Sequence, residues 1–330
     1  MSYSWGEDTE ATPLGGSGYD YASARRAYAE PGEGADHSAK RGKTPPPVGK
    51  EIQTESTHPL VVAVDVTGSM SSWPAVIFEK LPLFGKEVER YAPDYAISFA
   101  AVGDAYCDSE PLQVRDFDSG PALDQHIREL YPEGGGGDAP ESYDLAAYYY
   151  LNHCRIEKAV QPLFIFILDA PNHQELKPEA VQRFVGDTVN GPLNSARLIR
   201  ELAKKFIVYV VLKDFRQGSP TTRHWQNLVG APNVLPFEEP RDIVEVLIGI
   251  VAAETGAFED FKSRASERHA DKPDRIVRVM VSLKSVSLKH AASDGKGPSV
   301  TAVRSRKSGK EDKGSETGPA GGATRSKRLI

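Results

Sequence analysis

The chain has 330 residues, of which 39% are hydrophobic and 26% charged, with 24 prolines, 29 glycines and a formal net charge of −6. It is long enough for one substantial core with polar ends, and no run of 18 or more apolar residues appears, which excludes a predicted membrane span. The acidic start MSYSWGEDTEATPLGG lacks the features of a signal peptide, so we expect a cytoplasmic protein.

The first 57 residues are rich in Gly, Ser, Pro, Tyr and charge, with three consecutive prolines at 45–47. Such a composition is typical of a flexible, disordered arm. We therefore expect the folded domain to begin near residue 58.

Between residues 58 and 256, apolar segments of strand length alternate with helical patterns. Strands are expected over 61–66, 95–103, 112–117, 163–169, 206–212 and 233–237. Helices are expected over 75–91, 122–131, 142–154, 178–186, 194–204, 221–229 and 241–254. Strands that are apolar throughout and separated by helices predict an α/β fold with a doubly wound, mostly parallel sheet covered on both faces.

The remaining residues form a C-terminal extension over 257–290, in which 275–283 (RIVRVMVSL) is consistent with an added strand, and a tail over 291–330. Residues 271–330 hold 14 Lys and Arg against six Asp and Glu, so the C-terminal part of the chain is basic. Its basic clusters are diluted by Ser, Gly and Glu and carry no interleaved aromatics, so we expect a solvated low-complexity tail rather than a nucleic-acid contact.

Two smaller features lead to further expectations. Cys107 and Cys154 have no CxxC spacing, which excludes a disulfide framework and a zinc knuckle, and we expect buried thiols. Three consecutive tyrosines at 148–150 cannot share one helix face, so at least one is expected on the surface.

Three loops that follow strands or precede helices carry acids: DVTGS (65–69), GGGGDAPES (134–142) and DAPNH (169–173). Asp65 and Asp169 each terminate a buried strand, and ligand sites of doubly wound sheets lie beyond the carboxyl ends of the strands. Neighbouring strands would bring these two carboxylates close together. Such a pair repels unless a cation lies between them.

The spacing of Asp65, Thr67 and Ser69 places alternate side chains on one side of a loop, and Gly68 permits the bend. Mg²⁺ prefers oxygen ligands in octahedral geometry, which carboxylates and hydroxyls supply. The trio therefore predicts half of a site for Mg²⁺ or Mn²⁺.

These motifs resemble the von Willebrand factor A (vWA) family, whose metal-ion-dependent adhesion site combines a D-x-S-x-S motif with one residue from each of two further loops. Asp65, Thr67 and Ser69 match the first motif, with Thr in place of the first Ser, and Asp169 matches the aspartate of the third loop. The resemblance spans residues 58–256 and implies the vWA fold for this range.

The second loop reads DAPE, which is similar to the I-like domains of integrin β subunits. The resemblance implies Glu141 as the second-loop ligand and Asp138 as a supporting acid. Ser71 and Ser72 stand where the integrin β type has the acids of an adjacent metal site, so one metal ion is expected per chain.

Each motif also has an interpretation without a metal. Asp138 and Glu141 have the spacing of a capping box at the start of a helix, with Pro140 tolerated in the first turn. DVTGSM could be a strand followed by an ordinary turn, and DAPNH a turn that contains proline. The three motifs in this order favour the metal site over separate structural roles.

Two functions are compatible with such a site. The first is a non-enzymatic protein–protein interaction module, in which an Asp or Glu of a partner protein completes the coordination of the metal. The resemblance implies partners of the intracellular ATPase, kinase or phosphatase type. The alternative is an Mg²⁺-dependent phosphatase-like hydrolase of the haloacid dehalogenase type, but that family needs an acid two residues after the nucleophile, where this chain has Thr67.

Overall fold

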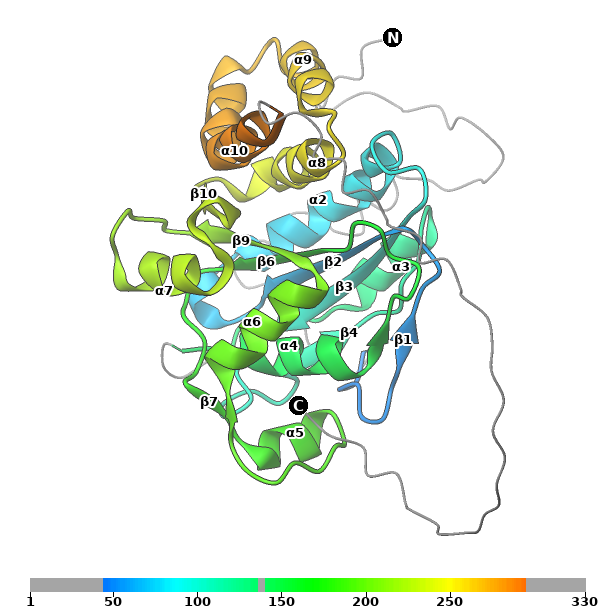
Figure 1. The fold of residues 1–330 in the computed structure, drawn as a ribbon, viewed down its shortest axis with the longest axis vertical. Helices are drawn as coiled ribbons and strands as arrows, with labels where there is room; N and C mark the ends of the chain where they lie inside the picture. The colour runs from blue at the N-terminus through cyan, green and yellow to red at the C-terminus, as the bar shows by residue number, and fades with distance from the viewer. Residues whose placement is uncertain (1–43, 136–139, 295–330) are drawn as a thin grey trace, which may run out of the picture. The chain divides into compact units, whose positions relative to one another are not determined.

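The structure is a computed structural model that describes residues 44–135 and 140–294 (Figure 1). The expectations for residues 1–43, for Asp138 and for 295–330 lie outside this part of the chain. The described residues form a mixed α/β domain around a six-stranded sheet. None of the helices they form combines the length and the apolar character needed to cross a membrane.

The strands of the central sheet follow the order β10-β9-β6-β2-β3-β4, and only β4 runs antiparallel to its neighbour. The bounds of these strands are β2 His58–Asp65, β3 Tyr95–Val102, β4 Leu112–Val114, β6 Leu163–Leu168, β9 Ile207–Lys213 and β10 Val234–Phe237. Each of the six strands matches one of the six expected strand segments to within a few residues. The prediction of a mostly parallel sheet is confirmed.

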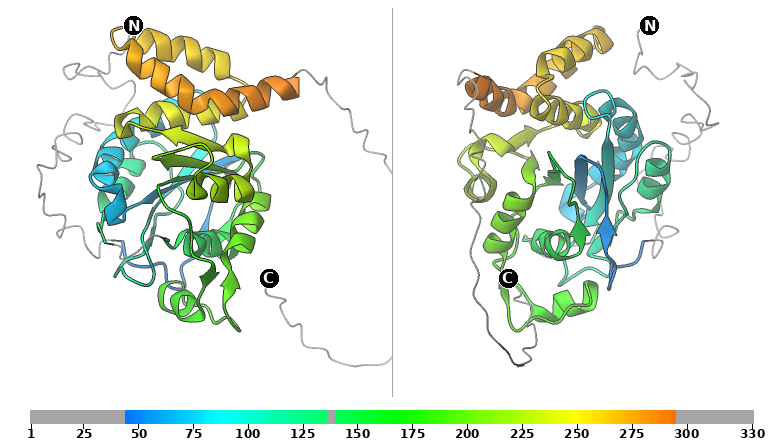
Figure 2. Two further views of the ribbon diagram at one scale, coloured as in Figure 1. Left: turned by 90° about the vertical axis from the view of Figure 1, so that its left-hand side faces the viewer. Right: turned by 45° about the vertical axis from the view of Figure 1, so that its right-hand side comes forward.

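Helices pack on both faces of the sheet. One core lies between the sheet and α2, α3, α8, α9 and α10, and the other between the sheet and α4, α5, α6 and α7. The bounds are α2 Trp73–Val88, α3 Ala122–Glu129, α4 Tyr143–Asn152, α5 Pro178–Phe184, α6 Ser195–Lys205, α7 Pro220–Val229, α8 Ile243–Glu254, α9 Phe258–Arg268 and α10 Pro273–Asp294. Figure 2 shows α8, α9 and α10 together at one end of the domain.

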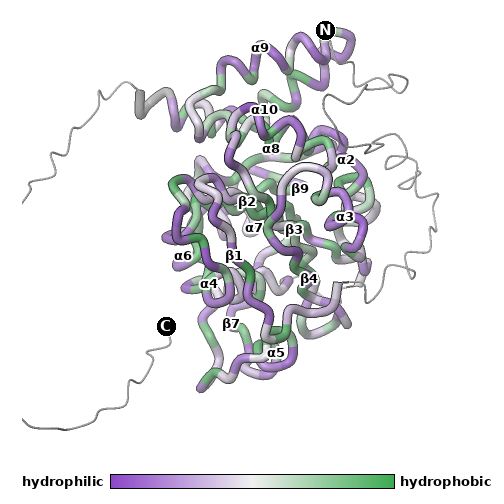
Figure 3. The backbone as a smooth tube through the Cα atoms, turned by 90° about the vertical axis from the view of Figure 1, so that its right-hand side faces the viewer, coloured by the Kyte–Doolittle hydropathy of each residue, from purple (hydrophilic) through white to green (hydrophobic). Residues whose placement is uncertain are grey.

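The central strand β2 shows why its sequence is apolar without alternation. Leu60, Val62 and Val64 belong to one core, whereas Val61 and Ala63 belong to the other. Because successive side chains of a strand point to opposite faces, a strand covered on both sides needs apolar residues at every position. The hydropathy of the backbone tube follows this pattern, with hydrophobic segments gathered along the central strands (Figure 3).

The strand order reverses between β2 and β6. From β2 the chain adds β3 and β4 on one side, and it later adds β6, β9 and β10 on the other. A crevice outside the carboxyl ends of the strands is expected at such a reversal, because the loops leave the sheet in opposite directions. Asp65 is the last residue of β2, and Asp169 directly follows β6.

Two short two-stranded sheets complete the domain. β1 (Ile52–Gln53) pairs in parallel with β5 (Cys154–Arg155), and β7 (Glu175–Leu176) pairs antiparallel with β8 (Leu193–Asn194). Ile52 is buried, so part of the segment assigned to the N-terminal arm belongs to the packed domain.

Three local expectations are wrong. The added strand expected over 275–283 is absent, because these residues lie in α10, whose buried residues Val279, Leu283 and Val286 recur at helical spacing. RIVRVMVSL is rich in β-branched residues, which are typical of strands, and for this reason a strand was predicted. The tyrosines at 148–150 are all buried, because α4 is enclosed on every side, so none of them lies on the surface. Of the two cysteines expected to be buried, Cys154 is buried and Cys107 is exposed.

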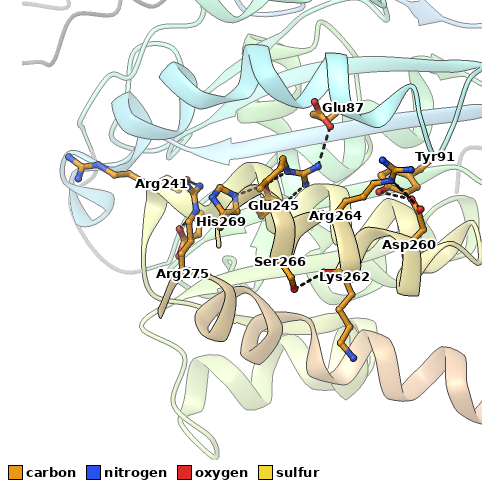
Figure 4. A network of polar contacts seen from close by, with 12 residues as sticks. Glu87, Tyr91, Arg241, Glu245, Asp260, Lys262, Arg264, Ser266, His269 and Arg275 are labelled. Atoms are coloured by element: carbon orange, nitrogen blue, oxygen red, sulfur yellow. Dashed lines mark hydrogen bonds and ion pairs between the residues drawn. The ribbon is translucent and has the colours of Figure 1, made fainter. Parts of the chain in front are cut away.

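Ion pairs attach the C-terminal helices to α8 (Figure 4). Glu245 of α8 is buried and pairs with Arg268 Nη2 at 2.9 Å and with His269 Nε2 at 2.9 Å. Arg268 also contacts Glu87 of α2 at 3.5 Å. A buried carboxylate is costly unless charged partners saturate it, so this network fixes how α9 packs on α8 and α2.

Candidate functional site

The loop after β2 folds around the carboxylate of Asp65. Oδ1 of Asp65 accepts hydrogen bonds from the backbone N–H of Thr67 at 2.8 Å and from its hydroxyl at 2.6 Å. Asp65 and Thr67 are both buried, and Ser69, exposed on the next turn, has its hydroxyl 3.1 Å from that of Thr67. The three predicted residues thus form one continuous polar chain.

The second strand end joins this chain. The Ser69 hydroxyl donates to Asp169 Oδ1 at 2.8 Å, a contact across 100 residues of sequence. The register explains it, because Val64 of β2 lies opposite Ile167 of β6 and the two strands end side by side. The prediction that Asp65 and Asp169 lie on neighbouring strand ends is confirmed.

Gly68 is needed for a close approach rather than for a left-handed bend, because it lies in a short 3₁₀ helix, Gly68–Met70, and its φ is not positive. A Cβ on Gly68 would lie 3.0 Å from the carbonyl oxygen of Gly135 and 3.2 Å from that of Gly134. Its own N–H donates to the carbonyl of Gly135. The glycine-rich loop therefore lies directly on the motif, as close contact between two backbones requires.

Glu141 lies in an extended segment before α4. Its backbone N–H donates to the Pro171 carbonyl at 3.0 Å, and its carbonyl accepts from the His173 N–H at 3.2 Å, so it pairs with the third loop as a short parallel bridge. The helix begins at Tyr143, with Ser142 at the position before it. The capping-box interpretation is therefore wrong for Glu141, which precedes the helix rather than lying in its first turn.

The side chain of Glu141 is buried, and its Oε2 has no hydrogen-bond partner. Burial, followed by the nearby charges of Asp65 and Asp104, raises the pKa of Glu141 to about 9, although a hydrogen bond with Thr67 opposes the shift. Burial likewise raises the pKa of Asp65 to about 6, against hydrogen bonds from Thr67 and Tyr143. The metal-free site thus holds carboxyl groups in an environment that disfavours their ionised forms.

Two supporting residues were not predicted. The Tyr143 hydroxyl, which is fully buried, donates to Asp65 Oδ2, so both oxygens of Asp65 are engaged. Asp104, two residues after β3, accepts from the Ser142 hydroxyl at 3.0 Å and contacts His173 Nε2 at 2.8 Å. Asp104 therefore ties the second and third loops together. No local motif marks Tyr143, which is one of several tyrosines in its helix.

Lys213, the last residue of β9, is a further residue of this edge that was not predicted. Its ammonium lies 3.4 Å from Asp169 Oδ2, donates to the carbonyl of Ser69, and is 5.3 Å from the centre of the Trp73 ring. The signal was present in the sequence, since IVYVVLK ends in a charged residue just as the strands before Asp65 and Asp169 do. A lysine at a strand end is common enough that it did not stand out.

Backbone conformation is unusual at the same edge of the sheet. Ser71, just after the first motif, has a φ of 54°, and Asp214, directly after Lys213, has a φ of 56°. Among the described residues these are the only non-glycine positions with positive φ. Such conformations cost free energy and gather at functional sites, and here one follows the first motif while the other follows Lys213, which contacts Asp169.

The donor chemistry fits a hard divalent cation. Carboxylates of Asp65, Glu141 and Asp169 and hydroxyls of Thr67 and Ser69 are oxygen donors of the kind that Mg²⁺ and Mn²⁺ prefer. The Oε2 atom of Glu141 is buried and has no hydrogen-bond partner, so a bound cation would stabilise this oxygen most. In residues 44–135 and 140–294, however, no three His, Cys, Asp or Glu side chains are already grouped as a metal centre, so the hydroxyls are essential to this fit.

Comparison with known proteins gives no family and no curated protein that matches this chain. The solved pilus adhesin SpaC of Lactobacillus rhamnosus GG is similar with a TM-score of 0.44 and 11% identity over 65% of this chain and 32% of the adhesin. Its open conformation gives a TM-score of 0.42 and 9% identity over 66% and 31%. Proximal thread matrix protein 1 of the mussel byssus gives a TM-score of 0.41 and 11% identity over 62% and 49%. The chain thus spans less than half the length of each of these proteins, and its function has to be argued from its own residues.

Proposed function

We propose that this protein is a metal-dependent protein–protein interaction module, in which Asp65, Thr67, Ser69, Glu141 and Asp169 hold one Mg²⁺ or Mn²⁺ ion. The observation that carries the proposal is the buried Oε2 of Glu141, which has no partner although it lies beside the polar chain from Asp65 to Asp169. A buried carboxyl oxygen without a donor is unfavourable, and a cation would satisfy it.

The bound ion would act as a Lewis acid with a coordination position open for a carboxylate of a partner protein. The chain supplies the rest of the recognition. Ser69 is exposed, whereas Asp65 and Thr67 are buried, so the accessible side of the polar chain is the side of Ser69. A partner Asp or Glu would approach there.

We assign the chain to the vWA type with a doubly wound sheet on the basis of its three loop motifs and the reversal of strand order between β2 and β6. A partner of the intracellular ATPase, kinase or phosphatase type stays a prediction from that resemblance, and a cytoplasmic location stays a prediction from the sequence pattern. The hydrolase alternative is not supported by the site, because the position two residues after Asp65 holds Thr67, whose hydroxyl donates to Asp65 and cannot serve as a general acid.

The test is calorimetric titration of the chelator-treated protein with Mg²⁺ and with Mn²⁺. We expect about one ion per chain for the wild type, and no binding for Asp65→Asn, because the amide removes a negative charge and one oxygen donor. Asp271→Asn, at an exposed position outside the site, is the matched control and should bind as the wild type does. Absence of binding to the wild type would refute the proposal, and hydrolysis of a generic aryl phosphate would favour the alternative.

If the ion binds, the partner can be sought by affinity capture with Mg²⁺ and again with chelator. A protein retained by the wild type only in Mg²⁺, and lost with Asp65→Asn in Mg²⁺, would identify the interaction as one that the metal mediates. Equal capture under both conditions would place the interaction elsewhere on the chain.

A further inference from the structure

Lys213 has an unusual environment for a lysine at a strand end. Its side chain is 12% exposed, and that of Asp169 is 9% exposed, so the ion pair between them is mostly shielded from water. The ammonium is held by three groups at once: the Asp169 carboxylate, the Ser69 carbonyl and the face of the Trp73 ring. An ordinary surface lysine keeps its charge in water and has no such set of partners.

Lys213 contacts two of the residues that would hold the metal, Asp169 and Ser69. Oδ1 of Asp169 accepts from the Ser69 hydroxyl, and Oδ2 faces the ammonium, so both oxygens of Asp169 are occupied by donors. The Ser69 hydroxyl can rotate to offer a lone pair to a cation. The ammonium has no lone pair to offer, and its positive charge repels any cation bound to the same carboxylate.

The position of Lys213 follows from the sheet rather than from a flexible side chain alone. Leu168 of β6 lies opposite Leu212 of β9, so the next residues, Asp169 and Lys213, lie beside one another at this edge of the sheet. The fold therefore places a positive charge at the third-loop aspartate in every molecule that lacks a metal.

We propose that Lys213 is the internal counter-ion of the metal-free site, and that its ammonium has to leave Asp169 when a divalent cation binds. Lys213 thereby competes with the cation and sets the concentration at which the site fills. This inference rests on the proposed function, because it concerns the regulation of the same site.

The test is the Mg²⁺ affinity of Lys213→Met, a substitution that keeps the length of the side chain over Trp73 and removes the charge. We expect the variant to bind Mg²⁺ on the order of tenfold more tightly than the wild type, since a tenfold change corresponds to an interaction of about one ion pair in a partly buried setting. Lys213→Arg retains the charge and should bind no more tightly than the wild type.

Lys177→Met is the matched control for the loss of a charged lysine. The Lys177 ammonium also lies over an aromatic ring, that of Tyr106 at 4.7 Å, but it is on the exposed third-loop side and no ion pair with a described carboxylate is found for it. The control should leave Mg²⁺ affinity within about twofold of the wild type, because the Lys177 charge is exposed and screened by solvent.

A metal-free double-mutant cycle tests the counter-ion role by itself. In chelator, Lys213→Met should lower the melting temperature by roughly 2–4 °C in the wild-type background, because it leaves Asp169 uncompensated beside Asp65. In the Asp169→Asn background the same substitution should cost much less, since the charge that it compensated is gone.

The outcomes separate the two proposals. Equal or weaker Mg²⁺ binding by Lys213→Met, with the wild type binding one ion, overturns the competition and leaves the metal-dependent function standing. Absence of Mg²⁺ binding by both proteins removes the proposed function and the competition together. Binding by Lys213→Met alone would refute the proposed function, because the wild type would then not hold the ion, and it would overturn the inference with it.

Discussion

The buried carboxyl group of Glu141 gives the sharpest test of the site, because the substitution Glu141→Gln keeps its shape and removes its ability to ionise. In the metal-free protein the folded-state pKa is raised to about 9 from an ordinary value of 4.5. Below pH 4.5 the group is protonated in both the folded and the unfolded chain, so it has no pH-dependent effect on stability. Above pH 4.5 the unfolded chain loses the proton first, and the free energy of unfolding falls as the pH rises toward 9.

The size of this effect follows from the interval between the two pKa values. From pH 4.5 to pH 7 the wild type should lose about 3 kcal/mol of stability through Glu141, at 1.36 kcal/mol for each pH unit. Glu141→Gln cannot lose a proton, so it should gain about 3 kcal/mol relative to the wild type over the same pH range. Any constant cost of burying the amide shifts both ends equally and does not affect this difference.

Urea unfolding in chelator at pH 4.5, 7 and 8.5 measures the effect for the wild type, for Glu141→Gln and for the exposed-site control Glu175→Gln. The control should follow the wild type at each pH. A constant difference between Glu141→Gln and the wild type from pH 4.5 to 8.5 would contradict the reasoning, because it would mean that Glu141 ionises alike in the folded and unfolded chain.

The same variant connects the pH effect to the metal. Glu141 has to give up its proton to serve as a ligand, so Mg²⁺ binding to the wild type should release a proton and tighten as the pH rises toward 9. Titrations in two buffers with different enthalpies of ionisation measure that proton. Glu141→Gln should bind Mg²⁺ weakly and without proton release from this position.

Two further substitutions test the surroundings of Asp65. Tyr143→Phe removes the donor to Asp65 Oδ2 in a fully buried pair, so we expect a loss of about 1–3 kcal/mol in urea unfolding, and an unchanged midpoint would show that the hydroxyl is dispensable. Gly68→Ala places a Cβ 3.0 Å from the carbonyl oxygen of Gly135, so it should lower the free energy of unfolding by about 1–3 kcal/mol and weaken Mg²⁺ binding. The control Gly191→Ala meets no atom within 4 Å and should be neutral. Equal effects of the two substitutions would exclude a steric cause.

The acids of the loops show how much of the candidate site can be predicted from the sequence. Asp65 and Asp169 are predictable neighbours because each lies at the end of a strand that is apolar at nearly every position, and parallel strands bring such ends to one edge of a sheet. The hydroxyls of Thr67 and Ser69 could be added because their spacing is local. These inferences needed only neighbours in the sequence and the regular geometry of strands.

Errors arose where a local pattern had two interpretations. RIVRVMVSL is rich in β-branched residues, yet it lies in a helix whose buried residues Val279, Leu283 and Val286 recur at helical spacing. The DAPE segment fits a capping box equally well, and it is the bridge from Glu141 to the third loop that holds Glu141 outside the helix.

The amino-acid pattern predicted that Asp65 and Asp169 lie at strand ends, that both faces of the sheet are covered, and that acids and hydroxyls gather at one edge. The folded chain is needed to see that Glu141 is buried without a partner for Oε2, and that Lys213 lies on Asp169 while contacting a loop 144 residues earlier in the chain. The physical reason is the range of the interactions. Strand and loop patterns are local in sequence, whereas burial and the partners of a charge depend on the register of strands and the loops that pack over them.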